Sequence, residues 1–179
     1  ESIRNHPEVL ALLAKGDHDL GDLRYTDRST AHTALVADRA AYILRRLGYS
    51  EREQEIARIA GFMHDIGNAI NRKNHAEYGA LLANDILKSV GMDMEDRIIV
   101  ISAIGNHDES TGGAKDPVSA ALILADKSDV RRNRVRTKDK EKFDIHDRVN
   151  YSVMGHSLKV DPVEKKIALN LQIDESICT

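Results

Sequence analysis

Histidine and aspartate stand side by side four times in this chain, and both residue types are common metal ligands. The pairs are His18-Asp19, His64-Asp65, His107-Asp108 and His146-Asp147. Imidazole nitrogens and carboxylate oxygens together suit divalent ions such as iron, manganese, cobalt, nickel and zinc. A dipeptide alone is weak evidence, because four copies do not all belong to one site. A His-Asp pair is informative only if other potential metal ligands in the chain lie at positions compatible with the same site.

The pair His64-Asp65 stands at the end of a predicted helix. Apolar residues precede it at the i, i+3, i+4 and i+7 spacing of a helix with one buried face, namely Ile56, Ile59, Ala60 and Met63. Ser50 and Glu53 have the spacing of a capping box, which predicts the start of this helix. We expect His64 and Asp65 to close the helix and Gly67 to end it.

Four more ionisable residues lie on, or at the end of, apolar faces of other predicted helices. They are His32 (with Val36, Ala40, Ile43 and Leu47), His75 (with Gly79, Leu82, Ile86 and Val90), His107 (after Val100, Ala103 and Ile104) and Asp126 (with Leu122, Ile123 and Val130). A buried ionisable group is costly unless it has a partner. A single histidine on an apolar face is more often a hydrogen-bonded core residue than a ligand. Four imidazoles and two carboxylates on inward faces together predict a metal centre.

The segments that carry these residues predict a mostly helical domain. We expect helices over about 6–14, 29–47, 75–90, 94–105 and 117–130, besides the one that starts after Ser50, and a loop over 15–27. Asp93 and Asp116 are expected to cap the helices that follow them. The tail alternates apolar and polar residues, which predicts a β-hairpin; its apolar residues are Tyr151, Val153, Leu158 and Val160, then Ile167, Leu169, Leu171 and Ile173. The fold class is therefore all-α, a helical bundle with a small C-terminal β-hairpin.

The composition indicates one globular domain. The chain has 179 residues, 31% of them charged, and a formal net charge of −3. This charge argues against a surface that coats a nucleic-acid polymer. No apolar run reaches membrane-spanning length and no leader pattern opens the chain, so we expect a cytoplasmic protein without membrane association. A single cysteine excludes a cysteine-rich zinc site.

The order His32, His64-Asp65, Asp126 resembles the HD superfamily of metal-dependent phosphohydrolases, which are all-helical proteins. The stretches His75-Ala-Glu-Tyr-Gly79-Ala80 and Ala103-Ile104-Gly-Asn-His107, the latter followed by Thr111-Gly112, are similar to the additional histidine motifs of its binuclear branch. That branch includes the bacterial symmetrical diadenosine tetraphosphate hydrolases and the HD-GYP phosphodiesterases. The stretch Ile123-Leu124-Ala125-Asp126, with a trailing Arg131, also resembles the pattern of the diadenosine tetraphosphate hydrolases. The resemblance covers about residues 28–136.

The resemblance implies a phosphohydrolase that cleaves a phosphate ester or anhydride of a small nucleotide-like substrate. His32, His64, Asp65, His75, His107 and Asp126 would hold two divalent ions, with iron or manganese expected first and cobalt, nickel, zinc or magnesium as alternatives. His64 and Asp65 would be the catalytic pair, with Asp65 bridging the ions, and a metal-activated hydroxide would be the nucleophile. Arg72, Lys73, Lys127 and Arg131 are candidates for binding substrate phosphate; ordinary surface charge is the alternative for each.

Two departures from the family pattern bear on the substrate. Many relatives have a lysine where this chain has Asn68, and no Gly-Tyr-Pro signature follows His107, which argues against cyclic di-GMP hydrolysis. The main alternative is a non-catalytic HD module in which metal stabilises the bundle for assembly or signalling. A third is a binuclear oxygenase. Asp108 and Glu109 are candidates for a supporting or water-activating role, or for an exposed acidic loop; His18, His146 and His156 are expected at the surface.

We divide the chain into an N-terminal helix and loop (1–27), the HD metal-binding domain (28–136), and a connector with the β-hairpin (137–179). A two-stranded hairpin alone is marginally stable in water. We therefore expect it either to pack on the bundle or to pair with a second subunit in a homodimer. The expected partner is a small phosphorylated compound rather than a nucleic-acid polymer.

Overall fold

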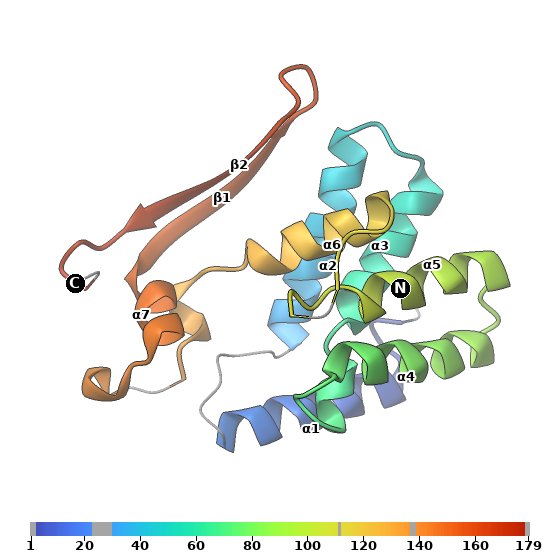
Figure 1. The fold of residues 1–179 in the computed structure, drawn as a ribbon, viewed down its shortest axis with the longest axis horizontal. Helices are drawn as coiled ribbons and strands as arrows, with labels where there is room; N and C mark the ends of the chain where they lie inside the picture. Colours follow the sequence, from blue (N-terminus) through green and yellow to red (C-terminus); the bar gives the residue numbers. More distant parts are fainter. Residues whose placement is uncertain (1–2, 23–29, 111, 137–138, 178–179) are drawn as a thin grey trace.

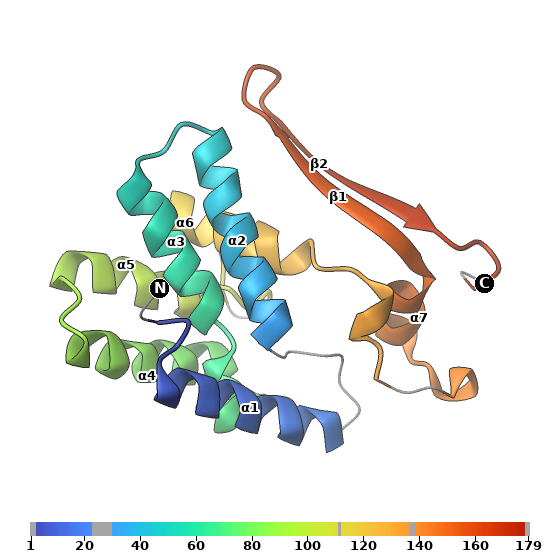
Figure 2. The same cartoon turned by 180° about the vertical axis from the view of Figure 1, so that it is seen from behind.

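Six helices pack into a bundle, and a two-stranded hairpin stands beside it (Figures 1 and 2). The computed structural model describes residues 3–22, 30–110, 112–136 and 139–177. The bundle helices are α1 (Pro7–Asp22), α2 (Thr30–Arg46), α3 (Glu51–Met63), α4 (His75–Ser89), α5 (Met94–Gly105) and α6 (Pro117–Lys127). The expected fold class, helical with a C-terminal hairpin, is confirmed.

The core of the bundle is aliphatic. Its fully buried large side chains include Ile43, Leu44, Met63, Leu87 and Leu122. These residues come from α2, α3, α4 and α6, so the core lies where the helices cross. None of the described helices combines the length and the apolar character that crossing a bilayer requires.

Helix α3 begins as the sequence predicts but ends differently. The Ser50 side chain accepts from the Glu53 backbone, and the Glu53 carboxylate accepts from the Ser50 backbone, which completes the capping box. The helix ends at Met63 with His64 as its C-cap, and a 3-10 turn, η1 (Ile66–Ala69), follows. Gly67 lies inside that turn, so the expectation that it ends the helix was wrong.

Gly67 is required by close packing. A Cβ atom added to Gly67 would lie 1.9 Å from the His75 carbonyl oxygen and 2.5 Å from the Gly79 nitrogen. The turn after Asp65 therefore lies directly against the first turns of α4. This contact brings His75 next to the His64-Asp65 pair.

The loop expected over 15–27 was wrong for residues 15–22, which continue α1; residues 23–27 lie outside the described part. Leu13 and Leu20 are both buried, and Lys15 pairs with Asp19 one turn on at 2.6 Å. Gly16 allows α1 to approach the turn at Asn68 and Ala69, where an added Cβ would meet atoms at 3.0–3.1 Å. Tertiary packing thus keeps a glycine- and aspartate-rich segment helical.

Helix α6 starts with the expected cap, since Asp116 and Ser119 form a capping box with Pro117 in the first turn. It ends at Lys127 rather than near residue 130. The Ser128 hydroxyl donates to the Ala125 carbonyl at 2.8 Å, and the Arg39 guanidinium donates to the Ser128 carbonyl at 2.6 Å. The expected cap of α5 is not made through a side chain: Asp93 is at the N-cap position without a side-chain hydrogen bond.

The tail contains a helix that the sequence analysis missed, α7 (Ile145–Ser152). Asp144 and Asp147 form its capping box, with aspartate in place of the usual glutamate. Tyr151 lies in this helix and not in a strand. The hairpin then follows as expected, with β1 (Val153–Asp161) antiparallel to β2 (Lys166–Ile173).

The hairpin packs on the bundle through β1. Val160 is buried in the core, and Leu158 packs against it from the same face of the strand. Arg46 of α2 donates to the Val160 carbonyl, and Arg39 lies 2.5 Å from the His156 Nδ1 atom. Pairing with a second subunit stays a prediction.

We predict that Gly67→Ala destabilises the protein by about 3 kcal/mol, because the added methyl group collides with the α4 backbone. Urea unfolding measures this change. Gly113→Ala is the matched control, since a Cβ there would meet no heavy atom of the described residues within 4 Å. Equal stability of the two variants would contradict the packing role of Gly67.

Candidate metal centre

All six candidate ligands lie at or near helix ends and are buried, with at most 8% exposure. His32 is in the first turn of α2, His64 caps α3, and Asp65 follows it. His75 opens α4, His107 lies just beyond α5, and Asp126 is in the last turn of α6. The bundle therefore gathers in one place the residues that the sequence singled out.

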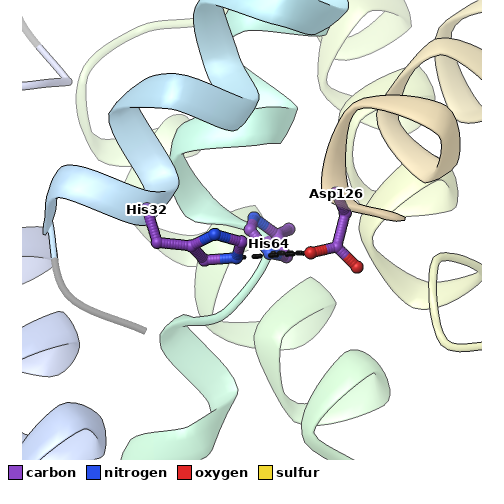
Figure 3. Close-up of side chains that lie close together, drawn as sticks. All are labelled: His32, His64 and Asp126. Atoms are coloured by element: carbon purple, nitrogen blue, oxygen red, sulfur yellow. Dashed lines mark ion pairs between the residues drawn. The ribbon is translucent and has the colours of Figure 1, made fainter. Parts of the chain in front are cut away.

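His32, His64 and Asp126 form one group (Figure 3). The Asp126 Oδ1 atom lies 3.2 Å from the His32 Nε2 atom and 3.6 Å from the His64 Nε2 atom. These ligand atoms lie within 4.8 Å of one another, close enough to share one ion.

Asp65 connects this group to the other two histidines. Its Oδ2 atom lies 3.3 Å from the His64 Nε2 atom and 3.7 Å from the His32 Nε2 atom. Its Oδ1 atom lies 3.6 Å from the His75 Nε2 atom. The two oxygens of one carboxylate thus face different histidines, which is the arrangement of a bridging ligand.

The four imidazole rings are all oriented by hydrogen bonds at Nδ1. The Nδ1 atoms of His64, His75 and His107 donate to the backbone carbonyls of Gly61, Arg72 and Ile104, three residues earlier in each case. The His32 Nδ1 atom donates to the Asp129 carboxylate at 2.6 Å. Such bonds set the tautomer so that Nε2 can serve as a ligand.

The Nε2 atoms fit a bound cation. Those of His32 and His64 are buried and make no hydrogen bond of acceptable geometry within the described residues. The Nε2 atoms of His75 and His107 lie 3.2 Å apart. Two nitrogens held about 2.1 Å from one ion at about 90–109° would be about 3.0–3.4 Å apart. The donor set therefore suits a divalent metal.

The electrostatics of the pocket differ between two of its histidines. Burial lowers the pKa of His64, but the charges of Asp65 and Asp126 outweigh it and raise the value to about 10. Burial and the neighbouring His64 lower the pKa of His107 to about 4. Burial favours protonation of Asp126, yet the nearby imidazoles of His32 and His64 hold its pKa well below the usual range. The carboxylates thus attract positive charge to the His64 side of the site.

Asn68, where the family resemblance leads us to expect a lysine, is buried and contacts the candidate ligand Asp65. Its Nδ2 atom donates to the Asp65 Oδ1 atom at 2.8 Å and to the Asp65 carbonyl at 3.0 Å. Its Oδ1 atom accepts from Arg72 at 3.3 Å. Asn68 therefore orients Asp65 and links it to a cationic side chain.

The sequence analysis missed Asp129, which is 1% exposed. Its carboxylate accepts from His32 at 2.6 Å and from the Arg131 Nε atom at 2.5 Å, and the Arg134 Nε atom lies 3.6 Å away. Burial favours the neutral acid, but these hydrogen bonds and charges keep the pKa of Asp129 well below its usual range. The sequence predicted a helix that continues to about residue 130, and in such a helix nothing marks Asp129 as a partner of His32. Because α6 ends at Lys127 instead, the backbone after it places the Asp129 carboxylate against His32.

A cavity of about 590 Å³ opens beside the centre and is lined by His75, His107 and Asp126. Arg72 and Lys127, two of the four predicted phosphate-binding residues, also line it, and so does Arg134 from the arginine-rich run 131–136. Lys73 is exposed and is not among the described lining residues. Arg131 is paired with Asp129 and likewise does not line the cavity. Their substrate contacts stay predictions.

The remaining polar candidates divide between the cavity and other surfaces. Asp108 and Glu109 both line the cavity, and the Asp108 Oδ2 atom lies 3.4 Å from the His75 Nδ1 atom. His146 is exposed, as expected, but it stands at the rim of this cavity. His18 is exposed on α1, whereas His156 is partly buried beside Arg39.

Comparison with known families matches residues 30–152 to the model described as the HD domain. The matched range holds all six candidate ligands and ends with α7. A crystal structure of a predicted HD superfamily hydrolase from an uncultured Thermotogales bacterium is similar, with a TM-score of 0.53 and 27% identity. The similarity covers 70% of this chain and 68% of that one.

Two curated proteins are also similar. An uncharacterized protein of Methanocaldococcus jannaschii is 29% identical over 150 residues, which cover 71% of this chain and 57% of the relative. Ribonuclease Y of Campylobacter jejuni is 31% identical over 144 residues, which cover 77% of this chain and 24% of the relative. The chain thus spans less than two thirds of the length of either protein.

We predict that Asp129→Asn weakens binding of Mn²⁺ about 10- to 100-fold, because the His32 ring loses its anionic hydrogen-bond partner. Competition with a chromophoric chelator measures the affinity. Asp19→Asn, on a surface turn of α1, is the matched control and should bind Mn²⁺ like the wild type. Unchanged affinity in Asp129→Asn would show that Asp129 does not support the metal centre.

Proposed function

The chain belongs to the HD domain family, and from this membership we propose that it is a metal-dependent phosphohydrolase acting on a small nucleotide-like substrate. The observation that carries the proposal is the convergence of four imidazoles and two carboxylates, of which His75, His107 and Asp126 line a cavity of about 590 Å³. The similarity to an HD superfamily hydrolase supports hydrolytic chemistry. A cavity of this size is in the range that holds small organic ligands.

The charge of the cavity supports a role for metal in binding phosphate. Its lining has three cationic side chains, Arg72, Lys127 and Arg134, and five carboxylates, which gives a formal charge of −2; the carboxylates are Asp108, Glu109, Asp126, Asp129 and Asp144. A cavity with this net charge repels phosphate. Two divalent ions would reverse the sign, so we expect phosphate binding to depend on metal.

We infer two ion positions that share Asp65. His32, His64 and Asp126 would hold one ion, and His75 and His107 would hold the other, with iron or manganese favoured by the nitrogen and oxygen donor set. When bound, such ions supply Lewis acidity and lower the pKa of water toward neutrality. Asn68 would keep Asp65 in its bridging orientation. Arg72, Lys127 and Arg134 would neutralise substrate phosphate at the cavity side of the centre.

Two substrate classes are compatible with a phosphohydrolase centre of this kind. One is a nucleotide ester or anhydride, for which the symmetrical dinucleoside polyphosphate hydrolases and the nucleotidases are the models. The other is an RNA phosphodiester, which is favoured by the similarity to Ribonuclease Y. The net charge of −3 argues for the small substrate.

We predict that the protein loaded with Mn²⁺ or Fe²⁺ hydrolyses at least one compound in a panel of phosphate substrates. The panel holds nucleoside monophosphates, diadenosine tetraphosphate, cyclic nucleotides and a short RNA, with released phosphate and chromatography as readouts. Asp65→Ala should lose at least about 100-fold in rate, because it removes the bridging ligand. His18→Ala, on the exposed face of α1, should keep the full rate.

Activity on RNA alone would favour the second substrate class. Absence of metal-dependent hydrolysis across the whole panel would contradict the enzyme proposal and leave the metal-stabilised HD module. Oxygen consumption by an iron-loaded sample would instead indicate the oxygenase.

We predict that His107→Ala lowers the metal content from two ions per chain to one, because it removes a ligand of the second position and leaves the first intact. Elemental analysis after equilibration with Mn²⁺ and gel filtration measures the ratio. His146→Ala is the control, since it removes an exposed imidazole from the cavity rim. A ratio of one in the wild type would contradict two ion positions.

A further inference from the structure

Helix α7 supplies a second set of residues to the cavity lining, beside the candidate metal ligands. Ile145, Val149, His146 and Asn150 of this helix all line it. The first two are at i, i+4 spacing and so share one face, and the last two share the adjacent face. The wall therefore has an apolar stripe beside a polar one.

The burial of α7 is reversed relative to an ordinary surface helix. Its buried residues are polar, namely Asp147, Asn150 and Ser152, whereas Ile145 is 72% exposed and Val149 is 50% exposed. A helix on a protein surface normally turns its apolar side chains to the core. In α7 they are turned to the cavity, where a ligand can cover them.

Hydrogen bonds hold α7 to the segment that follows the metal ligand Asp126. The Asn150 Oδ1 atom accepts from the Arg131 backbone N–H at 3.2 Å. The Arg132 Nε atom donates to the Tyr151 carbonyl at 2.6 Å, and its guanidinium lies over the Tyr151 ring at 4.7 Å. The apolar wall therefore has a set position relative to the metal centre.

We propose that Ile145 and Val149 bind the nucleobase of a substrate whose phosphate lies at the metal centre, an inference that rests on the proposed function. Two parts of the cavity lining differ in chemistry: Arg72, Lys127 and the lining ligands suit phosphate, and the α7 stripe suits a flat apolar group. A nucleotide joins these two groups in one molecule. His146, exposed beside the stripe, can hydrogen-bond to the polar edge of the base.

The test compares two ligands that differ only in the base. Phosphonate analogues of AMP and of ribose 5-phosphate resist hydrolysis, and calorimetry with the Mn²⁺-loaded protein measures the affinity of each. We expect the AMP analogue to bind about tenfold tighter, which corresponds to burying roughly 55 Å² of apolar surface. In the double variant Ile145→Ser/Val149→Ser this difference should vanish, while the ribose analogue should bind as it does to the wild type.

Val163→Ser is the matched control, because it also replaces an exposed apolar side chain (86% exposed), but in the hairpin turn. Equal affinity of the wild type for both analogues, no binding of the AMP analogue, or an unaffected double variant would each overturn the inference. This test measures binding and the test of the proposed function measures hydrolysis, so the two can fail separately. Base-dependent binding without hydrolysis of any substrate would contradict the proposed function and leave the nucleobase site intact.

Discussion

The structure depends on one electrostatic constraint, the burial of four imidazoles and two carboxylates within contact of one another. Each group is costly to bury alone, because the interior solvates charge poorly. The carboxylates outweigh burial at His64 and raise its pKa, whereas burial and the neighbouring His64 lower the pKa of His107. Divalent cations would satisfy the carboxylates and all four Nε2 atoms together, which is why the donor set and its geometry belong to a metal centre.

Helix ends make this geometry possible. Three of the imidazoles donate to a carbonyl three residues earlier in their own segment, so local backbone orients them before any long-range contact is considered. The long-range requirements are met by contacts between distant parts of the chain. Gly67 lets the turn after Asp65 touch α4, and Asp129 orients His32 from 97 residues further along the chain. The orientation of three of the rings is therefore set by nearby backbone, whereas their proximity to one another is set by the packing of the helices.

The segment after α6 connects the centre to the rest of the cavity. Asp129 binds His32 on one side and pairs with Arg131 and Arg134 on the other. Arg131 and Arg132 in turn hold α7 through Asn150 and Tyr151. A single short stretch thereby links the candidate ligands, the cationic lining and the apolar wall, so the cavity beside the centre is built from residues on both sides of the arginine-rich run.

The sequence by itself determined the helical fold class, the hairpin, the α3 capping box, the Asp116 cap of α6 and the six residues that meet at the centre. These follow from periodicity and from the cost of burying ionisable groups, and both are readable along the chain. Tertiary structure alone decided the continuation of α1 through residues 15–22, the turn of Asp129 toward His32, the pairing of Arg131 away from the cavity, and the place of α7. Those outcomes depend on contacts between residues far apart in the chain, such as Gly16 with Asn68 and His32 with Asp129, which no local pattern records.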